Sequence, residues 1–124
     1  MSTSQRNRLA IVMICACALG GCFKSKEDAQ IELIECAAFQ SEIPPSLMET
    51  IYKELRNIGI EPVAIIPIPT LANAYTQKFD RTEVSARWSK GVAAGKELVE
   101  KRDAAGIAKY LKSCVGTFND ALRD

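Results

Sequence analysis

The chain has 124 residues, with 16 lysines and arginines against 15 aspartates and glutamates. A chain of this length builds one small domain. Its formal net charge of +1 at pH 7 leaves no basic surplus for nucleic-acid binding. There is no histidine, which excludes Ser-His-Asp triads, Cys-His pairs and the helical zinc-protease motifs. Composition therefore argues against a nucleic-acid-binding protein and against the histidine-dependent enzymes.

The first 22 residues have the composition of an export signal. Arg6 and Arg8 precede an uncharged apolar run, Leu9–Leu19. A membrane-spanning helix needs about 20 apolar residues, so this run is too short. A basic start, a short apolar run and an exit through small residues are typical of a secretory signal peptide.

The residues that follow the apolar run, Leu19-Gly20-Gly21-Cys22, resemble the lipobox of bacterial lipoproteins. The resemblance implies a thioether from Cys22 to diacylglycerol, cleavage after Gly21 and N-acylation of the new terminus. Palmitate-type chains contribute about 0.8 kcal/mol per buried CH₂, so several of them make a durable anchor where a single chain is marginal. Two alternatives remain: an ordinary secretory signal whose cleavage site precedes a cysteine, and an uncleaved anchor.

The sequence thus divides into a signal peptide (1–21), a lipidated tether (22–28) and a helical periplasmic domain (29–124). The tether residues Phe23–Asp28 reach roughly 20 Å at most, at about 3.5 Å per residue, so the domain stays close to its membrane. By the enterobacterial sorting rule, Phe23 after the cysteine implies the outer membrane. Lys24 and Ser25 resemble an inner-membrane retention signal of pseudomonads. Under either rule the domain faces the periplasm.

Cysteine usage predicts one disulfide bond. Cys15 and Cys17 belong to the signal peptide and Cys22 carries lipid, which leaves Cys36 and Cys114. Paired thiols persist as disulfides in an oxidising compartment. The alternative is two independent buried thiols, and two sulfurs without histidine do not predict a metal site. The bond is expected to join the first helix to the last.

Apolar residues recur at helical spacing along the remaining chain, which predicts a small all-α bundle of four to five helices. Ser46 and Glu49 form a capping-box pattern, and Thr70, Asp80 and Asp103 are expected to cap later helices. The small-residue patch Gly91–Gly95 costs helix propensity, which predicts close approach of another helix. The expected helices cover residues 28–40, 46–58, 70–79, 80–99 and 103–122.

The segment Ile60–Thr70 holds three prolines and is expected to be an extended, irregular crossover. Two interpretations of its apolar side chains are open. In one, alternate side chains are buried over the helices. In the other, the segment is exposed and docks a partner through Ile65, Ile66 and Ile68.

No residue pattern predicts catalysis, a cofactor or a metal. The pairs Glu32/Glu35 and Glu97/Glu100 have a spacing that suits cation binding or acid–base work, but they lie among polar positions and are expected on solvated helix faces. The leading hypothesis is a membrane-anchored module that binds an envelope protein, of the accessory, inhibitor, immunity or exclusion type. The alternative is a helical small-ligand carrier, with a pocket lined by Trp88, Tyr75 and Tyr110.

Overall fold

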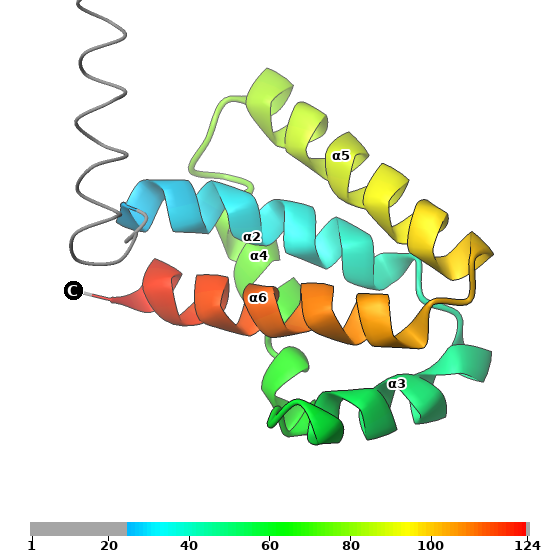
Figure 1. Cartoon of the computed structure of the whole chain (residues 1–124). Helices are drawn as coiled ribbons and strands as arrows, with labels where there is room; N and C mark the ends of the chain where they lie inside the picture. Colours follow the sequence, from blue (N-terminus) through cyan, green and yellow to red (C-terminus); the bar gives the residue numbers. More distant parts are fainter. Residues whose placement is uncertain (1–24, 124) are drawn as a thin grey trace, which may run out of the picture.

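The computed structural model describes residues 25–123, which form an all-α bundle without a strand in that range, as predicted. This range contains five α-helices and a short 3-10 helix, η1, between the second and third of them, and Figure 1 labels the α-helices. Their bounds are α2 Lys26–Ser41, α3 Pro45–Asn57, η1 Pro62–Ile65, α4 Ile68–Tyr75, α5 Arg81–Glu100 and α6 Ala104–Leu122.

Helix α2, the first of the described helices, lies at the centre of the bundle. It packs against α5, α6 and α4, whereas α3 packs mainly against α6. In Figure 1, α2 runs between α5 and α6, and α4 lies behind it. Apolar side chains on several faces of α2 are fully buried, among them Leu33, Ile34 and Phe39. Such all-round burial is typical of a helix at the core of a protein rather than at its surface.

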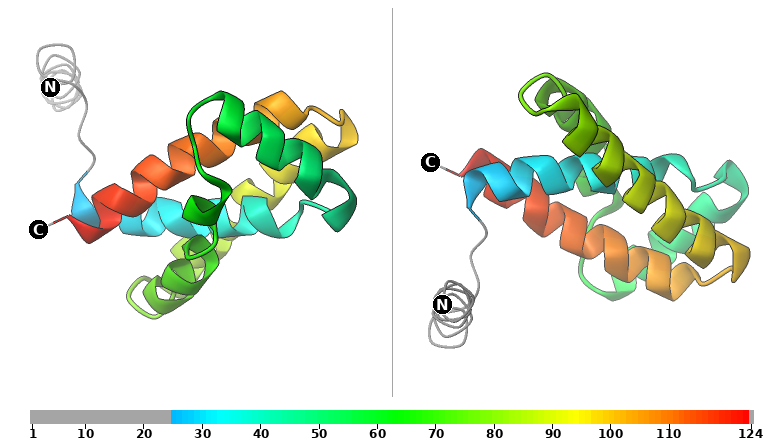
Figure 2. Two further views of the ribbon diagram at one scale, coloured as in Figure 1. Left: turned by 90° about the horizontal axis from the view of Figure 1, so that it is seen from below. Right: turned by 90° about the horizontal axis from the view of Figure 1, so that it is seen from above.

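The predicted disulfide bond is confirmed. Cys36 of α2 and Cys114 of α6 are bonded, with their Cα atoms 5.8 Å apart. Figure 2 shows that the start of α2 and the end of α6 lie together at one end of the bundle. Because the bond closes a loop of 78 residues, it should stabilise the fold by about 4.5 kcal/mol in the chain-entropy model.

The close approach predicted from Gly91 and Gly95 is also present. These glycines are the buried residues of α5. A Cβ atom at Gly91 would overlap the main-chain oxygen of Glu35, and one at Gly95 would lie 3.0 Å from the main-chain oxygen of Phe39. The long helix α5 therefore rests on α2 largely through backbone, with few of its own side chains in the core.

Helix starts agree with the predicted caps in two cases of four. Asp80 accepts a hydrogen bond from the Thr82 N–H at 3.0 Å, and Asp103 accepts one from the Gly106 N–H at 2.9 Å. The capping box predicted at Ser46 is wrong, because α3 already begins at Pro45. Proline suits the first helical position, where an N–H would have no helical partner. The cap predicted at Thr70 is wrong as well, because α4 already begins at Ile68.

The extended crossover predicted for Ile60–Thr70 is wrong as well. Its prolines occupy helix starts, where they are tolerated: Pro62 opens η1 and Pro69 lies in the first turn of α4. Helical spacing then places Ile65 (2% exposed) and Ile68 (0%) together in the core. The burial of these two residues agrees with the first of the two interpretations, and Ile66 alone of the three is exposed, at 65%.

The glycine contact supplies a test of the α2–α5 packing. We expect Gly91→Ala to lower the free energy of unfolding by about 1–3 kcal/mol, because the added methyl group forces α5 away from α2. Gly116 is the control, since nothing lies within 4 Å of a Cβ atom there. Gly116→Ala should stabilise the domain by up to about 1 kcal/mol through helix propensity. Urea denaturation measures both, and equal effects of the two substitutions would contradict this packing.

Candidate binding site

A groove separates α4 from α5 and is floored by α2. Both helices pack on α2 rather than extensively on each other, which leaves a channel of about 440 Å³ between them. This volume lies in the range of about 300–1,000 Å³ usual for ligand sites. We call it the α4–α5 groove. Its lining residues are Ile34, Ala37, Gln40 and Ser41 of α2, Pro69, Ala72, Asn73 and Thr76 of α4, and Trp88 of α5.

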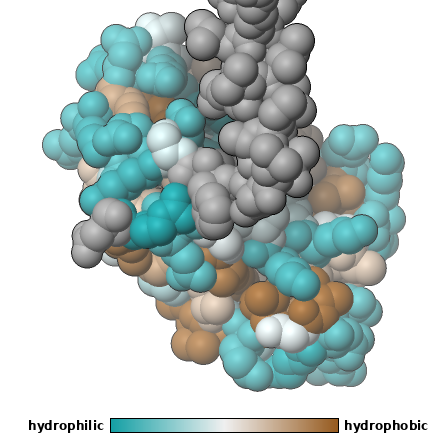
Figure 3. All heavy atoms as spheres, turned by 60° about the vertical axis from the view of Figure 1, so that its left-hand side comes forward, coloured by the Kyte–Doolittle hydropathy of each residue, from teal (hydrophilic) through white to brown (hydrophobic). Residues whose placement is uncertain are grey.

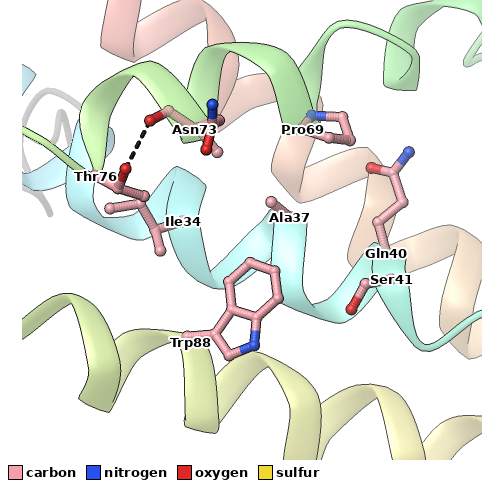
Figure 4. A pocket seen from close by; sticks show the side chains of 9 residues that line it. Ile34, Ala37, Gln40, Ser41, Pro69, Asn73, Thr76 and Trp88 are labelled. Atoms are coloured by element: carbon pink, nitrogen blue, oxygen red, sulfur yellow. Dashed lines mark hydrogen bonds between the residues drawn. The ribbon is translucent and has the colours of Figure 1, made fainter.

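The groove follows the axis of α2. Figure 4 shows Thr76, Asn73 and Pro69 along one side in an order that runs antiparallel to Ile34 and Gln40 on the floor. None of the lining residues carries a charge. The floor and inner wall are formed by small or apolar side chains, so the groove offers an apolar surface with polar groups at its rim.

Trp88 forms the opposite wall. It is the single tryptophan of the chain, and 42% of its surface is exposed. Its indole ring extends from α5 toward Ala37 (Figure 4). Tryptophan is strongly enriched among the residues that dominate binding energy at interfaces. A half-exposed tryptophan beside an apolar groove therefore marks this groove as the leading candidate site.

Gln40 adds an unused hydrogen-bond acceptor to the groove. Its Nε2 donates to the main-chain oxygen of Ile65 at 3.1 Å. Its Oε1 is buried and accepts no hydrogen bond from any described residue, and Figure 4 shows it directed to the Pro69 side of the groove. Buried polar atoms without a partner are uncommon in folded proteins.

The pocket predicted for a small-ligand carrier does not form from the three aromatic residues. Trp88 lines the groove, but Tyr110 stacks on Phe39 with ring centroids 3.7 Å apart. Tyr75 donates from its hydroxyl to the main-chain oxygen of Ala121 at 3.4 Å. The two tyrosines thus belong to contacts within the bundle.

The carboxylate pairs differ from each other. Glu35, predicted on a solvated face, is instead largely buried between helices, where it accepts from Arg87 and from the Tyr110 hydroxyl, both at 3.3 Å. Glu32 accepts from Thr117 at 3.0 Å. The pair Glu97/Glu100 is on the surface, as expected. Residues 25–123 contain no group of three or more potential metal ligands.

Other apolar side chains reach the surface outside the groove. Figure 3 shows separate apolar patches on a mainly hydrophilic face of the molecule. The large exposed apolar residues, Trp88 apart, are Ile58, Val63, Ile66 and Leu122. Within the segment Ile60–Thr70, the large apolar side chains exposed to solvent are therefore those of Val63 and Ile66.

The lipidation site Cys22, with Phe23 and Lys24, lies outside the described residues. Among the described helices, none is by itself long and apolar enough to cross a membrane. Helix α3 and residues Pro62–Tyr75 reach that length and apolar composition only when taken together, and the two are bent by 111° relative to each other.

Comparison with known proteins gives no relative: no family model, curated protein or solved structure matches this chain.

The contact between Tyr110 and Glu35 predicts a sensitivity to alkali. Burial raises the pKa of the Tyr110 hydroxyl, and the negative charge of Glu35, the hydrogen bond to it and the charge of Glu32 raise it further. Above the ordinary tyrosine pKa of about 10, the unfolded chain loses this proton while the folded chain keeps it. Stability therefore falls as pH rises through this range.

We expect the urea midpoint of the wild-type protein to fall more steeply between about pH 9 and about pH 11 than that of Tyr110→Phe, which has no phenolic proton to lose. Parallel urea titrations at the two pH values measure this difference. An equal fall in both proteins would show that Tyr110 does not control the alkaline response.

Proposed function

We propose that this protein is a lipid-anchored periplasmic lipoprotein that binds another envelope protein through the α4–α5 groove. The observation that carries the binding role is the groove itself, where a half-exposed tryptophan faces an apolar floor. Concave apolar surfaces with a few polar groups are the usual form of binding sites. The role requires no catalytic group.

The anchor is supported by the lipobox-like residues Leu19-Gly20-Gly21-Cys22. With Cys22 held in the lipid, the few residues before α2 keep the bundle near the bilayer surface. A groove on such a domain is well placed to meet the periplasmic part of a membrane protein. The outer membrane is the proposed location under the enterobacterial rule, and the inner membrane under the pseudomonad rule.

A small-ligand carrier is the second candidate function, and the volume of the groove favours it. About 440 Å³ would accommodate a small apolar molecule. However, the rim residues Pro69, Asn73 and Trp88 are exposed to solvent, whereas carrier sites bury most of their ligand. The open rim makes the protein-binding role the better supported of the two.

The anchor can be tested by the intact mass of the protein purified from membranes. We expect a mature chain that begins at Cys22 and carries a diacylglyceryl group and an N-acyl chain. Cys22→Ser should yield an unacylated chain that retains residues 1–21. A mature chain with a free Cys22 thiol would indicate an ordinary secretory signal, and a wild-type chain that retains residues 1–21 would indicate an uncleaved anchor.

The binding role can be tested with a matched pair of variants on α4. Asn73 lines the groove, and its neighbour Ala74 is also exposed but does not line it. Asn73→Lys places a charge in the uncharged groove, so we expect an envelope protein to co-purify with the wild type and Ala74→Lys but not with Asn73→Lys. Both variants should melt close to the wild type.

Retention of the same protein by Asn73→Lys would show that the groove is not the contact surface. Native mass spectrometry of the purified chain separates the two candidate functions, because a carrier should retain a small molecule that Asn73→Lys loses.

A further inference from the structure

We propose that one end of the bundle rests on the lipid bilayer, with the exposed side chain of Leu122 in the headgroup layer. We call this surface the anchor end, and it comprises residues 25–30, 76–80 and 121–123. The inference rests on the proposed lipid anchor at Cys22 and specifies which surface of the domain contacts the membrane. Apolar side chains that enter the headgroup layer are a recurring means of holding a protein on a bilayer.

The first argument is the length of chain between the anchor and the bundle. Only two residues separate Cys22 from Ser25, so the Cα atoms of Cys22 and Ser25 lie at most about 11 Å apart. The Ser25 hydroxyl accepts from the Asp28 N–H at 3.1 Å and caps α2, so the helix begins directly after Ser25. A reach of about 11 Å is no more than the diameter of one helix. The start of α2 is therefore held at the membrane surface.

The second argument is that three parts of the chain are bonded to one another at this end. Gln30 of α2 donates from its Nε2 to the main-chain oxygen of Ala121 at 3.3 Å, and its Oε1 accepts from Lys78. The Tyr75 hydroxyl donates to the same oxygen of Ala121 at 3.4 Å. Figure 2 shows the start of α2 beside the end of α6. The anchor therefore brings all three parts to the bilayer together.

The third argument is the position of Leu122, which is 51% exposed. Among the described large apolar residues with high exposure, Leu122 alone belongs to the anchor end. Ile66, by contrast, follows Ile65, whose main-chain oxygen accepts from Gln40. Gln40 lies about 20 Å from the start of α2, along the helix axis. Leu122 is thus the exposed apolar side chain that the anchor places at the headgroups.

Charge does not oppose this contact. The anchor end carries six exposed charged side chains, and their charges cancel: the cations are Lys26, Lys78 and Arg123, and the anions are Glu27, Asp28 and Asp80. Lysine and arginine have long apolar stems, so they can keep their charged groups among the phosphates while the stems lie deeper. Because the charges balance, the contact depends on Leu122 and on the acyl chains rather than on anionic lipid.

End-on contact also sets the direction of the α4–α5 groove. Ile34 and Thr76 line the part of the groove nearer the anchor end, and Gln40 lines the other part (Figure 4). Along α2, Ile34 lies about 13 Å and Gln40 about 22 Å from Ser25. A partner in the groove is therefore met through its membrane-proximal part.

The test uses the full chain, purified from membranes and reconstituted in phosphatidylcholine vesicles that contain a lipid with a nitroxide on its headgroup. In the mature chain Cys22 carries lipid and Cys36 is bonded to Cys114, so an introduced cysteine is the one free thiol for a fluorescent label. Asn119→Cys reports on the anchor end and Ala105→Cys on the far end. Both are exposed positions of α6, about 21 Å apart along the helix.

We expect the nitroxide to quench the label at Asn119→Cys at least about threefold more than the label at Ala105→Cys, because one headgroup layer is roughly 5–8 Å deep. Gln77→Cys, in the turn after α4, should be quenched like Asn119→Cys. Leu122→Asp should lower the quenching at Asn119→Cys by at least about twofold, because a carboxylate loses water on entering the layer. Ile66→Asp, the same change far from the anchor end, should leave it unchanged.

Equal quenching at Asn119→Cys and Ala105→Cys would overturn the inference and indicate a domain that lies on its side or tumbles at the surface. Unaltered quenching in Leu122→Asp would overturn the role of Leu122. The mass of the same preparation and its flotation with the vesicles test the anchor separately. An acylated chain that floats but is quenched equally at both sites rejects the orientation alone, whereas a chain without acyl groups rejects the anchor and the orientation with it.

Discussion

The arrangement depends on the burial of one helix, α2, against three others. Fully buried apolar residues such as Leu33 and Phe39 lie on more than one side of it, so every polar side chain that α2 carries inward needs a partner from a neighbouring helix. Gln30 donates to the main-chain oxygen of Ala121, and Glu35 accepts from Arg87 and Tyr110. Gln40 is the exception, because only one end of its amide is paired. It also lies where α2 borders the groove.

The groove follows from the way in which the neighbours of α2 are attached. Gly91 and Gly95 bring α5 close to α2 but contribute no side chain that extends toward α4. Helix α4 has eight residues and covers α2 from the other side. On the α5 side, the space between the two helices is lined by Trp88, which stays half exposed. The contact of Gly91 and Gly95 with α2 therefore has two consequences: the backbone of α5 packs closely on α2, and the apolar channel beside it stays unfilled.

Much of this fold could be predicted from local sequence. Helical periodicity gave the helices, two aspartate caps marked helix starts, and the elimination of other roles left Cys36 and Cys114 as a disulfide pair. The errors arose where local rules allow two outcomes: proline disrupts a helix interior but suits its first turn, so Ile60–Thr70 became helical. The buried role of Glu35 and the groove depend on contacts between residues of separate helices, which no local pattern encodes. Trp88 was the one groove residue predicted from the sequence to line a binding pocket, because of its side-chain type.

The central claim is that a partner protein covers the α4–α5 groove, and cysteine accessibility tests it most directly. Asn73→Cys places a thiol at the rim of the groove, and Lys112→Cys places one on the exposed surface of α6. The account predicts that a maleimide labels Asn73→Cys more slowly in native envelopes than in purified protein, whereas Lys112→Cys is labelled at the same rate in both. Equal labelling of Asn73→Cys in envelopes and in purified protein would contradict it.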